Sequence, residues 1–283
     1  MMKKMFATML ALSMCLSLAA CGPKGSASTS GSSAGTSGSS ASGSQAAASD
    51  VDYVKEKGTL VVGMTDFAPM DYKAEGSDEW IGFDADMAKA FAESLGVEVE
   101  FLEINWDNKA LELENKCVDA VWNGMTLTDD VKALMATSEP YCLNGQVVVL
   151  AADVADQYQT VESLSGLSFA VENGSAGMEQ AEAAGLDYVA MDTQAKALME
   201  VASGTSDAAI IDLLMAGAMI GEGTSYPDLT YTVQLNSEEY GVGFRKGSDL
   251  AEAFNNFWKE AYDAGTVMET AKTYGVQESV IEK

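Results

Sequence analysis

Short apolar runs rich in β-branched residues recur after residue 58 and alternate with segments of helical periodicity. Runs of this kind, bounded by polar residues and glycines, are typical of buried strands. The expected strands are Thr59–Met64, Val97–Ile104, Asp119–Trp122, Gln146–Leu150, Leu167–Val171, Asp187–Met191, Ala208–Ile211 and Val242–Arg245.

The intervening segments predict amphipathic helices. Phe83, Met87, Ala90 and Phe91 repeat at the spacing that places apolar side chains on one face of a helix. Further helices are expected around 198–201 and 253–261. Strands that alternate with helices predict an α/β fold built from βαβ units and mostly parallel sheet.

The first fifty residues do not share this pattern. Two lysines precede an uncharged run from Met5 to Ala20, which is shorter than the roughly 20 residues of a membrane span. Small residues then lead to Cys21, so residues 1–20 are expected to be a signal peptide. The segment resembles a bacterial lipoprotein signal, which implies lipidation of Cys21. The alternative is an ordinary secretory signal in which Cys21 is incidental.

Residues 25–49 contain only Gly, Ser, Ala, Thr and Gln. Such a composition cannot bury a useful apolar area. Residues 21–50 are therefore expected to be a linker between the lipid and a folded body. One acyl chain holds a protein only marginally, whereas two hold it stably, and the lipoprotein modification implies at least two.

Composition excludes several classes of partner and site. The net charge is −27, and loss of Lys3 and Lys4 with the signal would make it −29. Such a chain repels nucleic acid and anionic membrane surfaces. It has no histidine, and its cysteine spacing does not indicate a zinc site. Cys117 and Cys142 remain after Cys15 and Cys21 are assigned to the leader; export permits a disulfide between them, but two cysteines specify little.

Ligands of open α/β sheets bind outside the carboxyl ends of the strands. Four segments hold such positions, namely 64–67, 123–126, 172–175 and Asp212. Each has an alternative structural explanation.

Asp212 could cap the following helix. Residues 173–175 could form a plain turn or bind an anion at a helix N-terminus. Phe67 and Trp106 could be core aromatics or walls of a pocket, and Thr126 could simply satisfy backbone groups.

An ordered series of segments from about 57 to 275 resembles the family 3 extracellular solute-binding proteins, the polar amino-acid-binding proteins of ABC importers. The most specific motif is Gly-Phe-Asp-x-Asp at residues 82–86. The other matching segments are 58–63, 67–70, 118–121, 126–128, 138–141, 146–149, 207–212 and 240–244.

The resemblance implies a two-lobed clamp of the type II periplasmic-binding-protein kind. Lobe 1 would comprise 51–149 plus 243–283, and lobe 2 would comprise 150–242. Two extended strands near 148–151 and 240–244 would form the hinge. A ligand between the lobes would favour the closed state.

The family's ligand contacts in lobe 1 can be carried over residue by residue. Its aromatic walls fall on Phe67, beside Asp66, and on Trp106. Its contacts to the ligand amine and carboxylate fall on the Gly124 backbone and the Thr126 hydroxyl.

The contacts in lobe 2 fall on three further positions. The carboxylate cradle corresponds to Ser175 and the backbone N–H of Ala176. The acid for the ligand ammonium corresponds to Asp212. A buried ammonium without a counter-charge would be costly by several kcal/mol, and an aspartate supplies that charge.

One departure from the family pattern affects the expected ligand. The family has an arginine that clamps the ligand carboxylate, and Val131 stands at that position. Lys132 is adjacent but would point in another direction on a helix. Either a carboxylate is bound through Ser175 and Lys132, or the ligand is recognised mainly as an amine through Asp212, Phe67 and Trp106. The acidic residues near these positions favour a cationic ligand, and therefore recognition mainly as an amine.

The expected function is capture of a small amine-bearing nutrient, an amino acid or an amino-acid-derived amine, for ABC permease subunits. We expect a monomer on the outer face of the cell membrane, attached only through its lipid, without a cofactor, a metal or catalytic activity. The alternatives are a ligand-sensing domain and, on the same fold, an enzyme like cyclohexadienyl dehydratase.

Overall fold

The computed structural model describes residues 49–283. The predicted signal peptide, Cys21 and the linker as far as residue 48 lie outside the described residues. Helix α1 (Asp50–Lys57) begins the folded body, and the side chain of Ser49 caps it. No helix within 49–283 is both long enough and apolar enough to cross a membrane.

The first lobe is built on a mixed sheet with the strand order β4-β1-β5-β13-β6, and β7 also pairs with β13. Strand β1 is parallel to β4 and β5, whereas β13 is antiparallel to β5, β6 and β7. The bounds are β1 (Thr59–Met64), β4 (Glu98–Glu103), β5 (Ala120–Thr126), β6 (Ala136–Thr137), β7 (Cys142–Asn144) and β13 (Glu238–Phe244).

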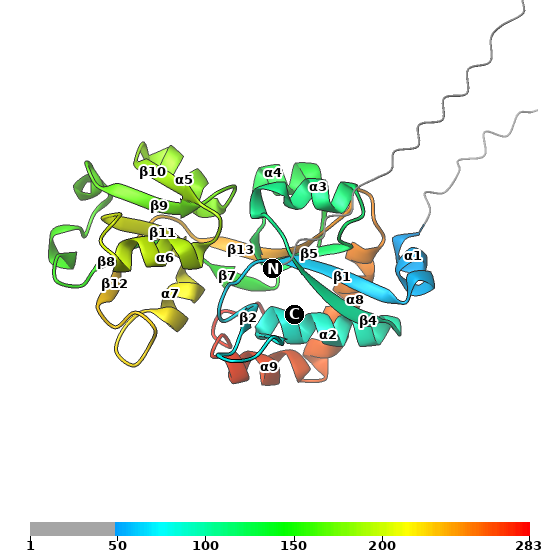
Figure 1. Ribbon diagram of the computed structural model, residues 1–283. Coiled ribbons are helices and arrows are strands. Elements are labelled where there is room, and N and C mark those ends of the chain that lie inside the picture. Colours follow the sequence, from blue (N-terminus) through cyan, green and yellow to red (C-terminus); the bar gives the residue numbers. More distant parts are fainter. Residues whose placement is uncertain (1–48) are drawn as a thin grey trace, which may run out of the picture. The chain divides into compact units, whose positions relative to one another are not determined.

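Helices cover both faces of this sheet (Figure 1). A two-stranded hairpin, β2 with β3, lies off the sheet. The elements of the first lobe besides α1 and the sheet are β2 (Tyr72–Lys73), β3 (Trp80–Ile81), α2 (Phe83–Leu95), the 3-10 turn η1 (Trp106–Asn108), α3 (Lys109–Glu114), α4 (Asp129–Leu134), α8 (Leu250–Asp263) and α9 (Thr266–Tyr274).

The second lobe is built on a five-stranded sheet with the order β10-β9-β11-β8-β12. Strands β9, β10 and β11 are parallel, and β8 and β12 are antiparallel to their neighbours. The bounds are β8 (Gln146–Ala151), η2 (Ala155–Gln157), η3 (Val161–Leu164), β9 (Ser168–Glu172), α5 (Ala176–Ala184), β10 (Asp187–Met191), α6 (Gln194–Ala202), β11 (Ala208–Asp212), α7 (Leu213–Met219) and β12 (Leu229–Gln234).

Alternation of side chains along the strands of the second sheet divides its core into two layers. Val148 and Ile210 face α5 in one cluster, and Val149 and Ile211 face α6 and α7 in another. Successive side chains of a strand point to opposite faces, so a sheet covered on both sides needs uninterrupted apolar runs. This explains why the runs at 147–150 and 208–211 are apolar throughout.

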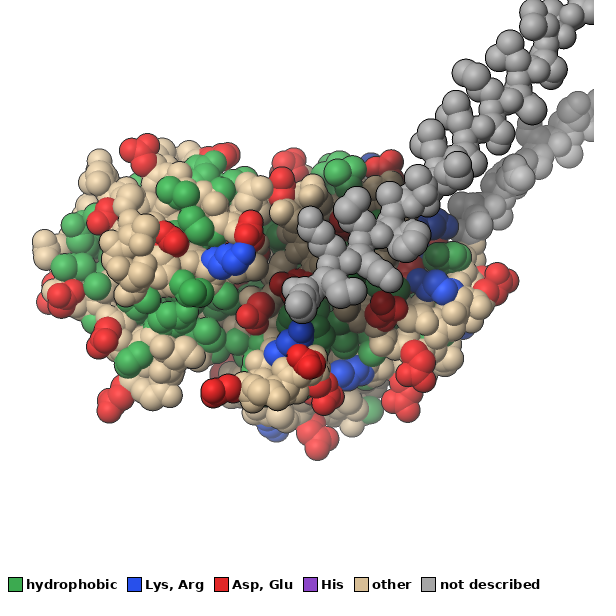
Figure 2. Space-filling model, in the orientation of Figure 1, with side chains coloured by type: hydrophobic (Ala, Val, Ile, Leu, Met, Phe, Trp, Pro, Cys, Tyr) green, Lys and Arg blue, Asp and Glu red, His purple; other side chains and the backbone are tan. Residues whose placement is uncertain are grey.

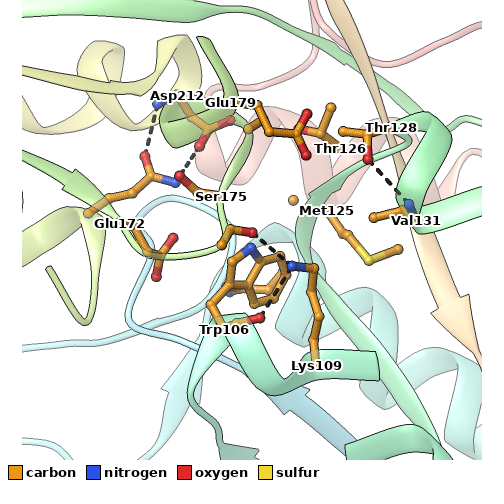
Figure 3. Close-up of a pocket in the computed structure, with 15 residues that line it drawn as sticks. Trp106, Lys109, Met125, Thr126, Thr128, Val131, Glu172, Ser175, Glu179 and Asp212 are labelled. Atoms are coloured by element: carbon orange, nitrogen blue, oxygen red, sulfur yellow. Dashed lines mark hydrogen bonds between the residues drawn. The ribbon is translucent and has the colours of Figure 1, made fainter. Parts of the chain in front are cut away.

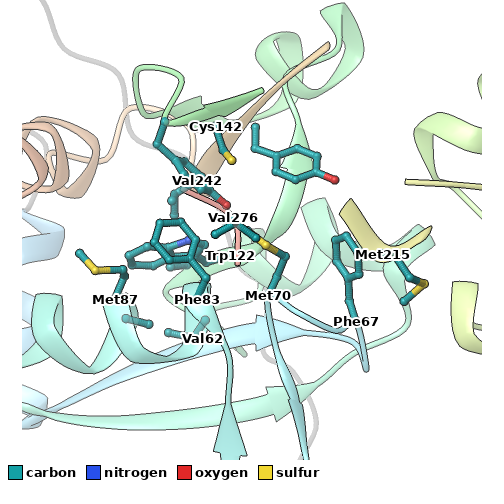
Figure 4. Close-up of a cluster of buried hydrophobic side chains, with 14 of the residues drawn as sticks. Val62, Phe67, Met70, Phe83, Met87, Trp122, Cys142, Met215, Val242 and Val276 are labelled. Carbon is teal, nitrogen blue, oxygen red and sulfur yellow. The ribbon is translucent and has the colours of Figure 1, made fainter. Parts of the chain in front are cut away.

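The first lobe has an aromatic core between its sheet and the helices α2 and α8. Trp122 from β5 meets Phe254 edge-on with ring centroids 4.9 Å apart, and Phe83 meets Trp258 edge-on at 6.1 Å. Met215, from α7 of the second lobe, belongs to the same cluster as Phe67 and Met70 of the first lobe (Figure 4). Apolar contact therefore continues from one lobe to the other.

The chain passes between the sheets twice, at Gly145 and at residues 235–237. The two crossings lie side by side, because the Leu235 N–H donates to the Gln146 carbonyl at 2.8 Å and the Gln146 N–H donates to Asn236 Oδ1 at 2.7 Å. The predicted lobe boundaries after residues 149 and 242 instead fall inside β8 and β13.

The predicted strands and the three predicted helices are present, with differences at their ends. Strand β5 continues to Thr126, so Asn123–Thr126 belong to a strand rather than follow one. The sheets are mixed rather than mostly parallel. Strands β8 and β13, which follow the two crossings, run antiparallel to their neighbours β11 and β5. Cys117 is exposed, Cys142 is buried, and both are free thiols.

Candidate functional site

A pocket lies between the lobes at the carboxyl ends of β5, β9 and β11 (Figure 3). Its cavity volume is about 30 Å³. A buried water requires roughly 10–15 Å³, so a solute the size of an amino acid needs the lobes to part or lining side chains to move. The lining residues are Trp106, Lys109, Asn123, Gly124, Met125, Thr126, Thr128, Val131, Glu172, Gly174, Ser175, Ala176, Glu179, Gln194 and Asp212.

A wider cavity of about 430 Å³ adjoins this pocket and shares Thr126, Thr128, Ala176 and Glu179 with it. Its wall is completed by residues 236–239, which comprise the end of the second crossing and the start of β13. Since both lobes contribute to its walls, a relative movement of the lobes changes access to the inner pocket.

Six of the eight predicted ligand-contacting residues line the pocket together. The first lobe contributes Trp106, Gly124 and Thr126, from η1 and β5. The second lobe contributes Ser175, Ala176 and Asp212, from the start of α5 and the end of β11. Residues that are far apart in the sequence thus meet where the strand ends predicted a site.

Asp66 and Phe67 do not line this pocket. A tight loop, in which the N–H groups of Phe67 and Asp71 donate to each other's carbonyls at 2.7 and 2.9 Å, turns the Phe67 ring into the core. The ring is 2% exposed and packs edge-on against Tyr240. Asp66 lines a separate groove with Tyr72. Their predicted ligand contacts stay predictions.

Asp212 occupies the N-cap position of α7, but its carboxylate makes no capping bond. Its Oδ1 instead accepts hydrogen bonds from the Tyr240 hydroxyl, Asn144 Nδ2 and Gln146 Nε2, and its Oδ2 accepts from Gln194 Nε2. Burial and the charge of Glu238 raise the pKa of Asp212 to about 7. A ligand cation nearby would favour the ionised form of this carboxyl.

Glu238 and Asp212 share two donors. The amides of Asn144 and Gln146 also donate to Glu238 Oε1, at 2.7 and 2.8 Å. The Thr126 hydroxyl donates to the same oxygen at 2.9 Å. This hydroxyl is therefore engaged by a carboxylate, and contact with a ligand carboxylate would require it to change partner. These hydrogen bonds connect residues next to the two crossings with Thr126 and Asp212 in the pocket lining.

The N-terminus of α5 reaches the pocket from the second lobe. Ser175 caps it, because its hydroxyl accepts from the Met178 N–H at 3.2 Å. Ala176 is the first helical residue, and an N–H at that position has no acceptor within its own helix. The predicted cradle of Ser175 and Ala176 is thus positioned at the end of a helix whose dipole favours negative charge.

Lys109 is a pocket residue that the sequence did not identify. Its ammonium donates to the Trp106 carbonyl at 3.2 Å and, across the cleft, to the Gly174 carbonyl at 2.9 Å (Figure 3). It also lies 5.0 Å from the centre of the Trp106 ring. Burial lowers the pKa of Lys109. Its spacing of one helical turn from Trp106 was the signal that could have placed it on the same face.

Glu172, the last residue of β9, is a second charged group of the pocket; it lies in the segment 172–175 where a site was expected, but no ligand contact was predicted for it. It is 3% exposed, and its Oε1 has no hydrogen-bond partner among the described residues. Burial, followed by the charge of Asp212, raises the pKa of Glu172 to about 8, although Lys109 acts in the opposite direction. Its position directly at a strand end was the signal in the sequence.

Val131 lines the pocket at the position where the resemblance implies an arginine. It lies in α4, is 7% exposed and packs with Met125, Leu127 and Met135. Lys132 is exposed and does not line the pocket. The lysine that faces the pocket is Lys109, on a different helix.

Comparison with known proteins gives one consistent family. Residues 60–277 match the bacterial extracellular solute-binding proteins, family 3. The chain is similar to the arginine-binding extracellular protein ArtP of Bacillus subtilis (strain 168), with 29% identity over 283 residues that cover 96% of this chain and 98% of the relative.

Two solved structures extend this comparison. A mutant of ArgBP from T. maritima has 33% identity and a TM-score of 0.74, covering 80% of this chain and 98% of the other. The ancestral amino acid-binding protein AncCDT-1, a precursor of cyclohexadienyl dehydratase, has 30% identity and a TM-score of 0.73, covering 80% and 99%.

Proposed function

The chain belongs to the bacterial extracellular solute-binding proteins of family 3, and on this basis we propose that it captures a small amine-bearing nutrient for ABC permease subunits. The nutrient is an amino acid or an amine derived from one. The similar ArtP is named for arginine binding. The observation that carries the proposal is the pocket between the lobes, where Asp212 and Trp106 come together.

Asp212 serves as the counter-charge for the ligand ammonium. Its carboxylate is held in place by donors from four side chains, so little conformational entropy is lost when a ligand binds. The ring of Trp106 forms the opposite wall and favours a cation by about 0.5–2 kcal/mol.

The amine of the ligand contributes more to recognition than its carboxylate does. The Val131 side chain offers no donor to a ligand carboxylate, and Lys132 is exposed and does not line the pocket. A carboxylate, where the ligand has one, is held by Ser175 and the Ala176 N–H, beside the ammonium of Lys109.

Isothermal titration of amino acids against their decarboxylated amines tests this proposal. We expect the amine to retain most of the affinity of its amino acid, and Asp212→Asn to weaken both. Tight binding of ordinary α-amino acids, together with no binding of the amines, would overturn amine recognition. Absence of binding by every amine-bearing solute would overturn the proposed function itself.

Recovery of the ligand after incubation distinguishes binding from catalysis. One similar structure is a precursor of cyclohexadienyl dehydratase, but the relatives described here are themselves named as binding proteins. We propose that the ligand is recovered unchanged. Release of a dehydrated product from a cyclohexadienyl acid would contradict this.

We further propose that the protein acts as a monomer attached to the outer face of the cell membrane through lipidated Cys21. Support comes from the lipoprotein-like signal in the sequence and from membership of an extracellular family. Metabolic labelling with a fatty acid, compared with Cys21→Ser, tests the anchor, and the variant is expected to lose the label.

A further inference from the structure

Charge is distributed unevenly around the pocket. Between residues 150 and 242 the sequence has one basic residue, Lys196, and fifteen acidic ones. The second lobe accordingly contributes only acids to the charged lining, namely Glu172, Glu179 and Asp212, and the first lobe contributes Lys109. Figure 2 shows acidic side chains over both lobes on the face in view. The pocket lining therefore has three carboxyl groups and one ammonium, so a carboxyl is available to a ligand besides Asp212.

The two buried acids of the pocket differ in how they are partnered. Both oxygens of Asp212 accept hydrogen bonds from side-chain donors. Glu172 Oε1 has no partner among residues 49–283, although the side chain is 3% exposed. A buried polar atom without a partner is costly, and such an atom in a ligand pocket is available to a group of the ligand.

Lys109 is the lysine in the lining of the same pocket, but its ammonium is used elsewhere. It donates to the carbonyls of Trp106 and Gly174 and makes no ion pair with Glu172. Strands β9 and β11 are neighbours in the sheet, so Glu172 and Asp212 open onto the same end of it. A ligand that reaches Asp212 is therefore within the same cavity as Glu172.

We propose that Glu172 is a specificity-determining residue that binds a second cationic group of the ligand. The ligand class is then a small dication, such as a dibasic amino acid or a diamine, with one amine at Asp212 and the other cationic group at Glu172. This inference rests on the proposed function, because it assumes that Asp212 holds the first amine.

Pairs of solutes that differ only in the second charge test the inference. Isothermal titration would compare L-lysine with L-norleucine and 1,5-diaminopentane with pentylamine. A hydrogen bond to a charged group corresponds to roughly tenfold or more in affinity. We expect each dication to bind the unmodified protein at least about tenfold more tightly than its partner, and Glu172→Gln to bring this ratio close to one.

Glu222→Gln is the matched control, since it makes the same charge change at an exposed loop position of the second lobe. It should preserve the ratio. Thermal unfolding of each variant verifies that it is folded. The inference is overturned if the monocations bind as tightly as the dications, if Glu172→Gln preserves the ratio, or if Glu222→Gln removes it equally. Binding of norleucine or pentylamine in those cases leaves the proposed function intact, whereas binding of none of the four solutes contradicts the function as well.

Discussion

At the scale of single residues, the pocket keeps two carboxyls where water solvates their charge poorly. Burial is the main reason that the pKa of Glu172 is about 8 and that of Asp212 about 7. Each is therefore substantially protonated near neutral pH in the absence of a ligand, whereas in the unfolded chain both would be ionised.

This difference predicts how stability depends on pH. An acid whose folded pKa is raised binds more protons in the folded state than in the unfolded state, so stability is greatest at low pH in this window and falls as pH rises. For Glu172 the window runs from its ordinary value of 4.5 to about 8, with a slope of roughly 1.4 kcal/mol per pH unit. Denaturant titrations from pH 5 to pH 8 should show a shallower decline for Glu172→Gln than for the unmodified protein. An equal or steeper decline would mean that Glu172 is solvated in solution.

The cap of α5 gives a second prediction at this scale. The Ser175 hydroxyl accepts from the Met178 N–H, so Ser175→Ala should lower the free energy of unfolding by about 1 kcal/mol. If the cap also cradles a ligand carboxylate, the variant weakens binding of amino acids more than binding of their decarboxylated amines. Chemical denaturation and titration measure the two effects separately, and equal weakening of both ligands would assign Ser175 a structural role alone.

At the scale of elements, the two crossings are held close together and leave no space for a side chain at Gly145. A Cβ there would lie 2.5 Å from Gln234 Nε2 and 2.7 Å from the Asn236 carbonyl oxygen. Gly145→Ala should therefore destabilise the protein by about 1–3 kcal/mol. Gly217→Ala is the contrasting change, because a Cβ in α7 at that exposed position meets nothing within 4 Å. It should stabilise by up to about 1 kcal/mol. Stability of Gly145→Ala equal to that of the unmodified protein would show that the crossings separate readily.

The elements also show which information the sequence carried. Apolar runs such as 147–150 and 208–211 predicted strands correctly, because a strand covered on both faces is apolar throughout. Strand β12 was not predicted, since it forms by pairing with β8, a strand far from it in the sequence.

The site was predictable to the extent that it lies at strand ends. Asp212 and Ser175 were placed there by position, and the pocket contains both. Phe67 does not line the pocket, because the loop closed by its hydrogen bonds with Asp71 turns its ring into the core, and its predicted ligand contact stays a prediction. Lys109 contacts the Gly174 carbonyl only where the two lobes meet, so its place in the pocket depends on a tertiary contact that its local sequence does not specify.

At the scale of the whole described body, the lobes are joined across the cleft by the hydrogen bond from Lys109 to the Gly174 carbonyl. The backbones also meet closely at this point, since a Cβ on Gly174 would lie 2.7 Å from the Asp107 Cα. Closure brings these groups together, so the bond exists only when the lobes are near each other. It therefore contributes to the balance between the open and closed states.

Lys109→Met should shift this balance toward the open state. A hydrogen bond from a charged group contributes about 1.5–3 kcal/mol, which corresponds to roughly a tenfold to hundredfold change in the ratio of closed to open molecules. Small-angle scattering without ligand should show a larger radius of gyration for Lys109→Met, and a saturating ligand should reduce it. Lys196→Met is the control, because Lys196 is exposed and pairs only with Asp192 within its own lobe. If Lys109→Met and Lys196→Met scatter identically, the bond to Gly174 does not hold the lobes together. The closed arrangement would then depend on apolar contacts such as that between α7 and the Phe67 cluster.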